Sequence, residues 1–158
     1  MSSPSSLISA ARGWVGTPYH HRARIKGVGV DCGQLVIAAL IEAGLMDPFD
    51  PGYYTSDWHL HRFEDRYIEC VEQHLVRFDE SELSVDARMI ENSTYAAPSA
   101  SVIVFRVGRT SSHGGIVSTW PFFIHAYQPS RQVEEVSILN TPMARRPARV
   151  YMSEGLMS

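Results

Sequence analysis

The chain has 158 residues and a formal net charge of −3, with 44% apolar and 20% charged residues, so we expect residues 1–158 to form a single globular domain. The negative charge argues against a nucleic-acid partner, because no basic field attracts phosphate. No run approaches the ~20 apolar residues of a membrane span, and no signal peptide is recognisable, which predicts synthesis in the cytoplasm.

Three helices separated by loops are predicted for the first half of the chain. Apolar spacing indicates a short opening helix, then a helix that is apolar on almost every face, then an amphipathic helix. Proline, glycine and aspartate mark the loops between them. The helices span 5–14, 32–43 and 58–76, with loops at 16–30 and 47–56. The middle helix has no polar face, so we expect it to be buried.

After residue 98 the apolar spacing changes to that of strands. Five short runs rich in β-forming residues are separated by turn residues. They span 102–107, 114–119, 122–127, 133–139 and 148–152. Helices followed by a strand meander predict an α+β domain, in which the buried helix packs on a C-terminal antiparallel sheet of about five strands.

Asp31-Cys32 stands between a glycine-rich loop and the buried helix. Asp31 is a suitable N-cap, which places Cys32 in the first turn of the helix. The positive end of the helix dipole favours the thiolate, the nucleophilic form of cysteine, whereas Asp31 opposes it. A cationic partner is therefore needed, and His113 and His125 are the candidates. The alternative is that Cys32 is a small buried hydrophobe.

His113 and His125 flank a predicted hairpin. A cysteine hydrolase needs a thiol, a base and a group that orients the base. The two histidines share a face of the sheet when the loop between their strands has an odd number of residues. A three-residue loop, Thr119-Trp120-Pro121, satisfies this condition and keeps Pro121 out of the ladder. The alternative is that both are ordinary half-buried histidines.

Four motifs together resemble the NlpC/P60 family of papain-like cysteine peptidases, and its phage tail-assembly and tail-tip branch in particular. They are Gly16-Thr17-Pro18-Tyr19, Gly29-Val30-Asp31-Cys32, Ser112-His113-Gly114-Gly115-Ile116-Val117 and Ile124-His125-Ala126. The chain departs from the family at Gly33-Gln34, where the family has Ser-Gly, and at Ala100-Ser101, where it has Gly-Asp. The resemblance implies the papain-like NlpC/P60 fold, with neither a cofactor nor a metal.

The resemblance also implies a reaction, the cleavage of a peptidoglycan stem peptide between γ-D-glutamate and a diamino acid. Cys32 would be the nucleophile, His113 the base and His125 the group that orients His113. Tyr19 would place its hydroxyl at the oxyanion site beside the backbone N–H of Cys32, a natural oxyanion donor. Asp31 would cap the helix and could receive a cationic group of the substrate.

The resemblance to the phage branch predicts an enzyme that acts at the bacterial cell wall after delivery in a phage tail. Its partners would be the peptidoglycan peptide and phage tail proteins. Two alternatives stay open: a non-catalytic structural tail-assembly protein, and a cysteine acyltransferase on the same scaffold.

The other histidines and the second cysteine have open or structural roles. His20 and His21 could line the mouth of the cleft or lie in a solvated loop. His59 and His61 have the spacing of metal ligands on a strand, but in a helix residues i and i+2 diverge. Cys70 is expected in the core, on the inner face of the amphipathic helix.

Overall fold

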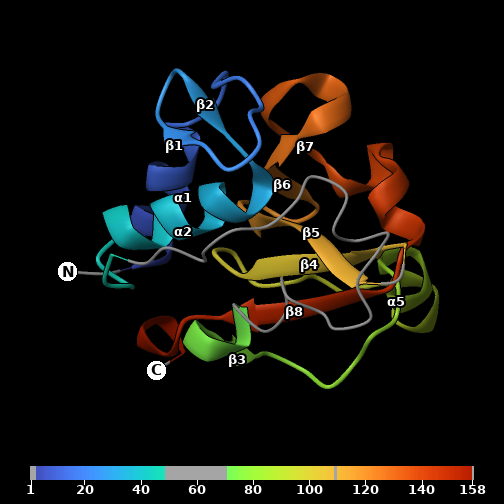
Figure 1. Ribbon diagram of the computed structural model, residues 1–158. Coiled ribbons are helices and arrows are strands. Elements are labelled where there is room, and N and C mark those ends of the chain that lie inside the picture. Colours follow the sequence, from blue (N-terminus) through green and yellow to red (C-terminus); the bar gives the residue numbers. More distant parts are fainter. Residues whose placement is uncertain (1–2, 49–70, 109, 158) are drawn as a thin grey trace.

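The computed structural model of the protein describes residues 3–48, 71–108 and 110–157 (Figure 1). Its helices include α1 (Pro4–Arg12), α2 (Cys32–Glu42) and α5 (Val85–Glu91). The strands are β1 (Arg24–Ile25), β2 (Gly29–Val30), β3 (Val76–Arg77), β4 (Val102–Val107), β5 (Thr110–Val117), β6 (Phe122–Tyr127), β7 (Gln132–Ser137) and β8 (Ala148–Met152). None of the helices in these ranges is long and apolar enough to cross a membrane.

The first two helices begin at side-chain caps. Ser3 and Ser6 form a capping box at the start of α1, and Pro4 occupies its first turn. The Asp31 carboxylate accepts a hydrogen bond of 2.9 Å from the backbone N–H of Gln34, which confirms Asp31 as the N-cap of α2. The expected burial of α2 is also confirmed, because all seven residues from position 34 to position 40 are buried.

Six strands form one antiparallel sheet in the order β3-β8-β4-β5-β6-β7. The predicted strands 102–107, 122–127 and 148–152 are confirmed at their bounds, whereas β5 begins earlier and β7 ends earlier than expected. The sixth strand, β3, was not expected. It includes Val76, where a helix was predicted, because Val76 pairs with Met152 of β8. Residues 71–74 of that predicted helix are helical, as expected, whereas residues 58–70 lie outside the described residues.

The expected meander is correct only for β4 to β7. The last strand, β8, does not lie beside β7 but returns to pair with β4, where Val102 is opposite Tyr151. Both faces of β8 are covered in this position, since Val150 and Tyr151 are fully buried in different core clusters. The strand is therefore an interior strand of the sheet.

The two faces of the sheet carry separate hydrophobic clusters. Val102, Val104, Ile116 and Ile124 pack with α1 and α2, which lie together on one side in Figure 1. The other cluster lies with α5 and is formed by Val85, Ile103, Phe105, Val117, Phe123 and neighbouring residues. Since side chains alternate along a strand, the residues that precede and follow Ile124 point to the second face.

Candidate active site

His113 on β5 and His125 on β6 touch across the ladder. Ile116 pairs with Ile124, and Ser118 donates a hydrogen bond of 3.0 Å to the carbonyl of Phe122, so three residues, 119–121, span the turn. This odd-numbered loop places both histidines on one face. Nε2 of His113 lies 2.8 Å from Nδ1 of His125. The prediction that the two rings meet within hydrogen-bond range on neighbouring antiparallel strands is confirmed. The second part of that prediction, that the rings face the start of the Cys32 helix, stays a prediction, because the rings pack on Phe105 and Phe123 of the second cluster, whereas Cys32 packs against the first.

Glu134 is a third member of this cluster and was not predicted from the sequence. In the β6–β7 ladder His125 lies directly opposite Glu134, and His125 Nε2 is 2.8 Å from Glu134 Oε2. His113, His125 and Glu134 therefore form a continuous hydrogen-bonded row, called here the His–His–Glu row. It runs from two buried rings to a side chain that is 21% exposed. Pairing the predicted strands 122–127 and 133–139 as a hairpin would have brought this acidic residue to notice.

Because Gly115 has no side chain, His125 of the neighbouring strand can approach its Cα closely. A Cβ on Gly115 would lie 2.7 Å from the carbonyl oxygen of Ile124 and 3.0 Å from the Cβ of His125. The backbone of Ile124 cannot give way without moving β6. The glycine two positions after His113 is thus required by the close approach of the two strands.

Aromatic rings surround the histidines and keep them neutral. The Phe123 and Tyr127 rings lie 4.1 Å and 4.9 Å from the His125 ring, centroid to centroid. His125 is fully buried and His113 is 9% exposed. Burial lowers the pKa of His125 to about 3, and burial together with the neighbouring His125 lowers the pKa of His113 well below its usual value. Both rings are therefore uncharged at pH 7.

Tyr19, Asp31 and Cys32 form a second group at the start of α2. The Tyr19 backbone is held by hydrogen bonding of its N–H to the carbonyl of Arg131, 2.9 Å away, and by a bridge to Val30. Burial raises the pKa of the Tyr19 hydroxyl, with further contributions from the charges of Cys32 and Asp31. The Tyr19 side chain therefore lies close enough to both residues to feel their charges.

Asp31 is held by the loop that precedes α2. It is 2% exposed; one carboxylate oxygen caps α2, and the other accepts a hydrogen bond of 2.8 Å from the backbone N–H of Arg22. Nδ1 of His21 lies 3.8 Å from that second oxygen, whereas His20 is exposed. Of the two loop histidines, His21 is thus the one beside the site. The proposed contact of Asp31 with a substrate cation stays a prediction.

The pKa of the Cys32 thiol is set mainly by desolvation. The Cys32 side chain is partly buried; desolvation of its sulfur, and after it the negative charge of Asp31, raises the pKa of Cys32 to about 12. Backbone hydrogen bonding by Gly114, Gly33 and Cys32 itself acts in the opposite direction but is weaker. The backbone of the helix start therefore favours the thiolate and Asp31 opposes it, as expected. Desolvation of the charged sulfur was not predicted, and it outweighs the helix start, so that the thiol is neutral at pH 7.

Gly114 lies between the group formed by Tyr19, Asp31 and Cys32 and the His–His–Glu row. It follows His113 in β5, and its backbone is one of those that hydrogen-bond with the Cys32 sulfur. The start of α2 therefore meets β5 next to the outer histidine of the His–His–Glu row. A neutral thiol, a neutral imidazole that is itself hydrogen-bonded, and backbone N–H groups at a helix start are the parts that nucleophilic attack on a carbonyl requires.

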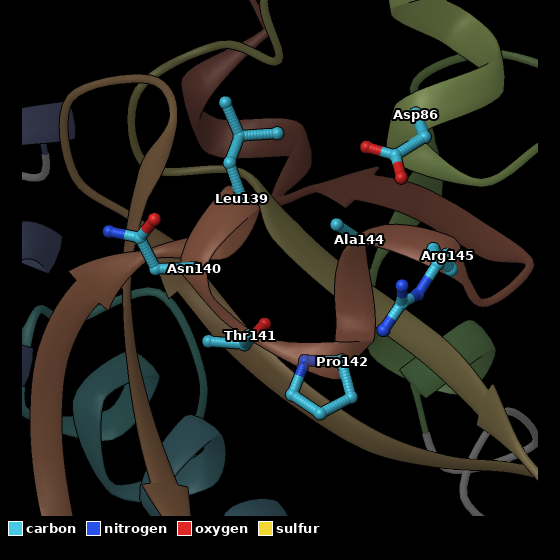
Figure 2. A pocket seen from close by; sticks show the side chains of 7 residues that line it. All are labelled: Asp86, Leu139, Asn140, Thr141, Pro142, Ala144 and Arg145. Carbon is cyan, nitrogen blue, oxygen red and sulfur yellow. The ribbon is translucent and has the colours of Figure 1, made fainter.

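A shallow hollow lies elsewhere, between α5 and the segment that follows β7 (Figure 2). It is lined by Asp86, Leu139, Asn140, Thr141, Pro142, Ala144 and Arg145. Its lining contains neither a thiol nor an imidazole. Within the described residues no cluster of three or more histidine, cysteine or acidic side chains could hold a metal, while His59, His61 and Cys70 lie outside those residues.

The sequence matches no protein-family model and no curated protein. Solved structures are similar over almost the whole chain. The NlpC/p60 domain of the peptidoglycan hydrolase SagA has a TM-score of 0.58 and 16% identity, covering 94% of this chain and 98% of that one. NlpC1 from Trichomonas vaginalis has a TM-score of 0.61 and 14% identity, covering 94% of this chain and 43% of that one.

An N-acetylmuramoyl-L-alanine amidase from Bacteroides uniformis ATCC 8492 is similar as well. Its TM-score is 0.58 at 13% identity, and the match covers 96% of this chain and 98% of that one. The chain therefore has the NlpC/P60 fold.

Proposed function

We propose that the protein is a cysteine peptidase of the NlpC/P60 type that hydrolyses an amide bond in peptidoglycan stem peptides. The observation that carries the proposal is the 2.8 Å contact between His113 and His125 beside Gly114, whose backbone hydrogen-bonds with Cys32. Two of the similar structures are named as peptidoglycan hydrolases, SagA and RipB from Mycobacterium tuberculosis, and a third as an N-acetylmuramoyl-L-alanine amidase.

In the proposed mechanism the resting pair is a neutral thiol and a neutral imidazole. The high pKa of Cys32 and the low pKa of His113 both favour this state at pH 7. The sulfur attacks the amide carbonyl while its proton passes to His113, so the thiolate forms only as it reacts. The oxyanion is stabilised by the backbone N–H of Cys32 and by the Tyr19 hydroxyl.

The second half of the reaction uses the same groups. Protonated His113 gives its proton to the leaving amine, which departs and leaves a thioester on Cys32. Water, deprotonated by His113, then attacks the thioester and releases the carboxylic acid and the free thiol. His125 holds the His113 ring in place through both steps.

The scissile bond that we propose joins γ-D-glutamate to the diamino acid, and the site of action is the bacterial cell wall, reached in a phage tail. These points are supported by the motifs of the sequence and not by the geometry. The structural tail-assembly role and the acyltransferase are the competing functions. An amidase acting on the bond to the glycan is a further outcome that the similar structures suggest.

The test is digestion of purified peptidoglycan, followed by mass analysis of the soluble products. A fragment whose N-terminus is the diamino acid supports the proposed bond. A released stem that begins with alanine identifies an amidase, and product formed only when an amine acceptor is added identifies an acyltransferase. If no peptidoglycan source yields product, the structural role replaces the proposed function.

A further inference from the structure

We propose that Glu134 is a positioning residue that sets the direction of the hydrogen bonds along the His–His–Glu row, so that Nδ1 of His113 keeps its lone pair. The proposal rests on the proposed function, because it assigns this lone pair to the base that takes the proton of Cys32. Neither the sequence motifs nor the similar structures assign a role to this residue.

The direction follows from what each group can donate. An ionised carboxylate only accepts hydrogen bonds, so the 2.8 Å contact to Glu134 Oε2 requires a proton on Nε2 of His125. A neutral imidazole carries one ring proton, so Nδ1 of His125 is then an acceptor. The 2.8 Å contact between the rings therefore requires the proton on Nε2 of His113. Nδ1 of His113 is left bare.

The contact between the two rings does not set this direction by itself. The same 2.8 Å separation is satisfied if Nδ1 of His125 donates to Nε2 of His113. In that arrangement the proton of His113 sits on Nδ1, and this nitrogen can no longer accept a proton from the thiol. A hydrogen-bond acceptor at the far end of the row excludes the reversed arrangement, and Glu134 is that acceptor.

The charge of Glu134 has a second effect. When His113 takes the thiol proton, a positive charge appears on a ring that aromatic side chains shield from water. The row connects this cation through His125 to a carboxylate. A negative charge at that position favours the protonated form of His113 at the moment of attack.

The neighbouring residue supplies a matched control. Glu135 follows Glu134 in β7, and its carboxylate accepts two hydrogen bonds of 2.9 Å from the Arg12 guanidinium. Successive residues of a strand point to opposite faces, so Glu135 lies on the face away from the row. Changing Glu135 removes a charge and an ion pair from the same strand without touching either histidine.

The test is nitrogen-15 NMR of the histidine rings, because protonated and bare ring nitrogens resonate far apart. The full-length protein is labelled at histidine and compared with Glu134→Leu, Glu134→Gln and Glu135→Gln. We expect bare Nδ1 on both His113 and His125 in the wild type and in Glu135→Gln. Glu134→Gln keeps this pattern, since the amide oxygen still accepts from His125. Glu134→Leu has no acceptor and shows a proton on Nδ1 of His113 in a large share of molecules.

Two results overturn the proposal. One is a wild type in which Nδ1 of His113 already carries the proton; the other is a Glu134→Leu spectrum with the same tautomers as Glu135→Gln. If Glu134→Leu does not fold, the protonation of the His113 ring in the wild type still tests the proposal, because a proton on Nδ1 contradicts it. Peptidoglycan cleavage forms a separate arm, in which Glu134→Leu lowers kcat by about 10- to 100-fold with little change in KM, and Glu135→Gln does not.

The NMR measurement and the cleavage assay distinguish a failure of this proposal from a failure of the proposed function. A wild type that cuts no peptidoglycan but shows bare Nδ1 on His113 overturns the function and leaves the role of Glu134 intact. A wild type that cuts, with the opposite ring protonation, overturns the role of Glu134 alone.

Discussion

Gly115 and His125 approach so closely across the β5–β6 ladder that a Cβ on Gly115 would lie 3.0 Å from the Cβ of His125. The position of the central histidine therefore depends on the absence of a side chain on the neighbouring strand. His113 and His125, the candidate base and its proposed orienting residue, are held by paired strands and not by loops, which fixes their separation.

We predict that Gly115→Ala destabilises the protein by about 1–3 kcal/mol, because the added methyl meets the carbonyl of Ile124 and displaces β6 with His125. Urea unfolding followed by circular dichroism measures the change. Gly155→Ala is the control, since its Cβ meets no backbone atom but only side-chain atoms, Cδ2 of Leu45 at 3.2 Å and Oγ of Ser153 at 3.7 Å. Equal unfolding midpoints for Gly115→Ala and wild type would show that the strands tolerate a larger separation.

Alkylation of Cys32 by iodoacetamide should be slow at pH 7 and should rise steadily up to at least pH 10. The reason is the pKa of about 12, which leaves little thiolate at neutral pH. Asp31→Asn should raise the rate at pH 8 several-fold, because asparagine still caps the helix but no longer repels the thiolate.

Mass spectrometry of the Cys32 peptide gives this rate separately from any reaction of Cys70. Asp86→Asn, on α5, is the control and should leave the rate unchanged. A rate that reaches a plateau below pH 8 would contradict the neutral pair, since it would reveal a thiolate–imidazolium pair at rest.

The buried histidines should make the folded state less stable in acid. In the unfolded chain a histidine takes up a proton near pH 6.5, whereas in the folded state the pKa of His125 is about 3 and that of His113 is also lowered. The two histidines therefore make their full contribution to the free energy of unfolding above pH 6.5, and this contribution is lost as the pH falls toward 3. The loss is about 1.4 kcal/mol per pH unit for each histidine.

Urea unfolding at several values between pH 4 and pH 7 measures that slope. His125→Gln should reduce it, because glutamine does not titrate. A wild-type stability that stays constant from pH 6.5 to pH 4 would mean that the rings can be protonated without cost in the folded state.

The parts of the fold that the sequence predicted are those with a local signal. Strands 102–107, 122–127 and 148–152 alternate or carry continuous apolar runs, and the parity of the three-residue turn follows from neighbouring residues alone. The place of β8 beside β4 depends on contacts distant in sequence, so no local pattern indicates it. Helix α5 was missed because it is short and buries only Val85 and Arg88.

The site was predictable to the same extent. Asp31 as the N-cap and the meeting of His113 with His125 follow from capping preference and strand alternation. Glu134 required the register of a second hairpin. The pKa of Cys32 required knowledge of its burial, because the helix dipole and desolvation act in opposite directions and only the tertiary structure decides which is larger.

The most direct test of the proposed function is the digestion of peptidoglycan by wild type and by Cys32→Ala, with the soluble fragments identified by mass. Wild type should release a fragment that begins with the diamino acid, and Cys32→Ala should release none while unfolding cooperatively like the wild type. His113→Ala should reduce the rate by a factor on the order of 10²–10⁴, because the general base is missing. Unchanged release by Cys32→Ala would contradict the account, because the reaction would then proceed without the thiol.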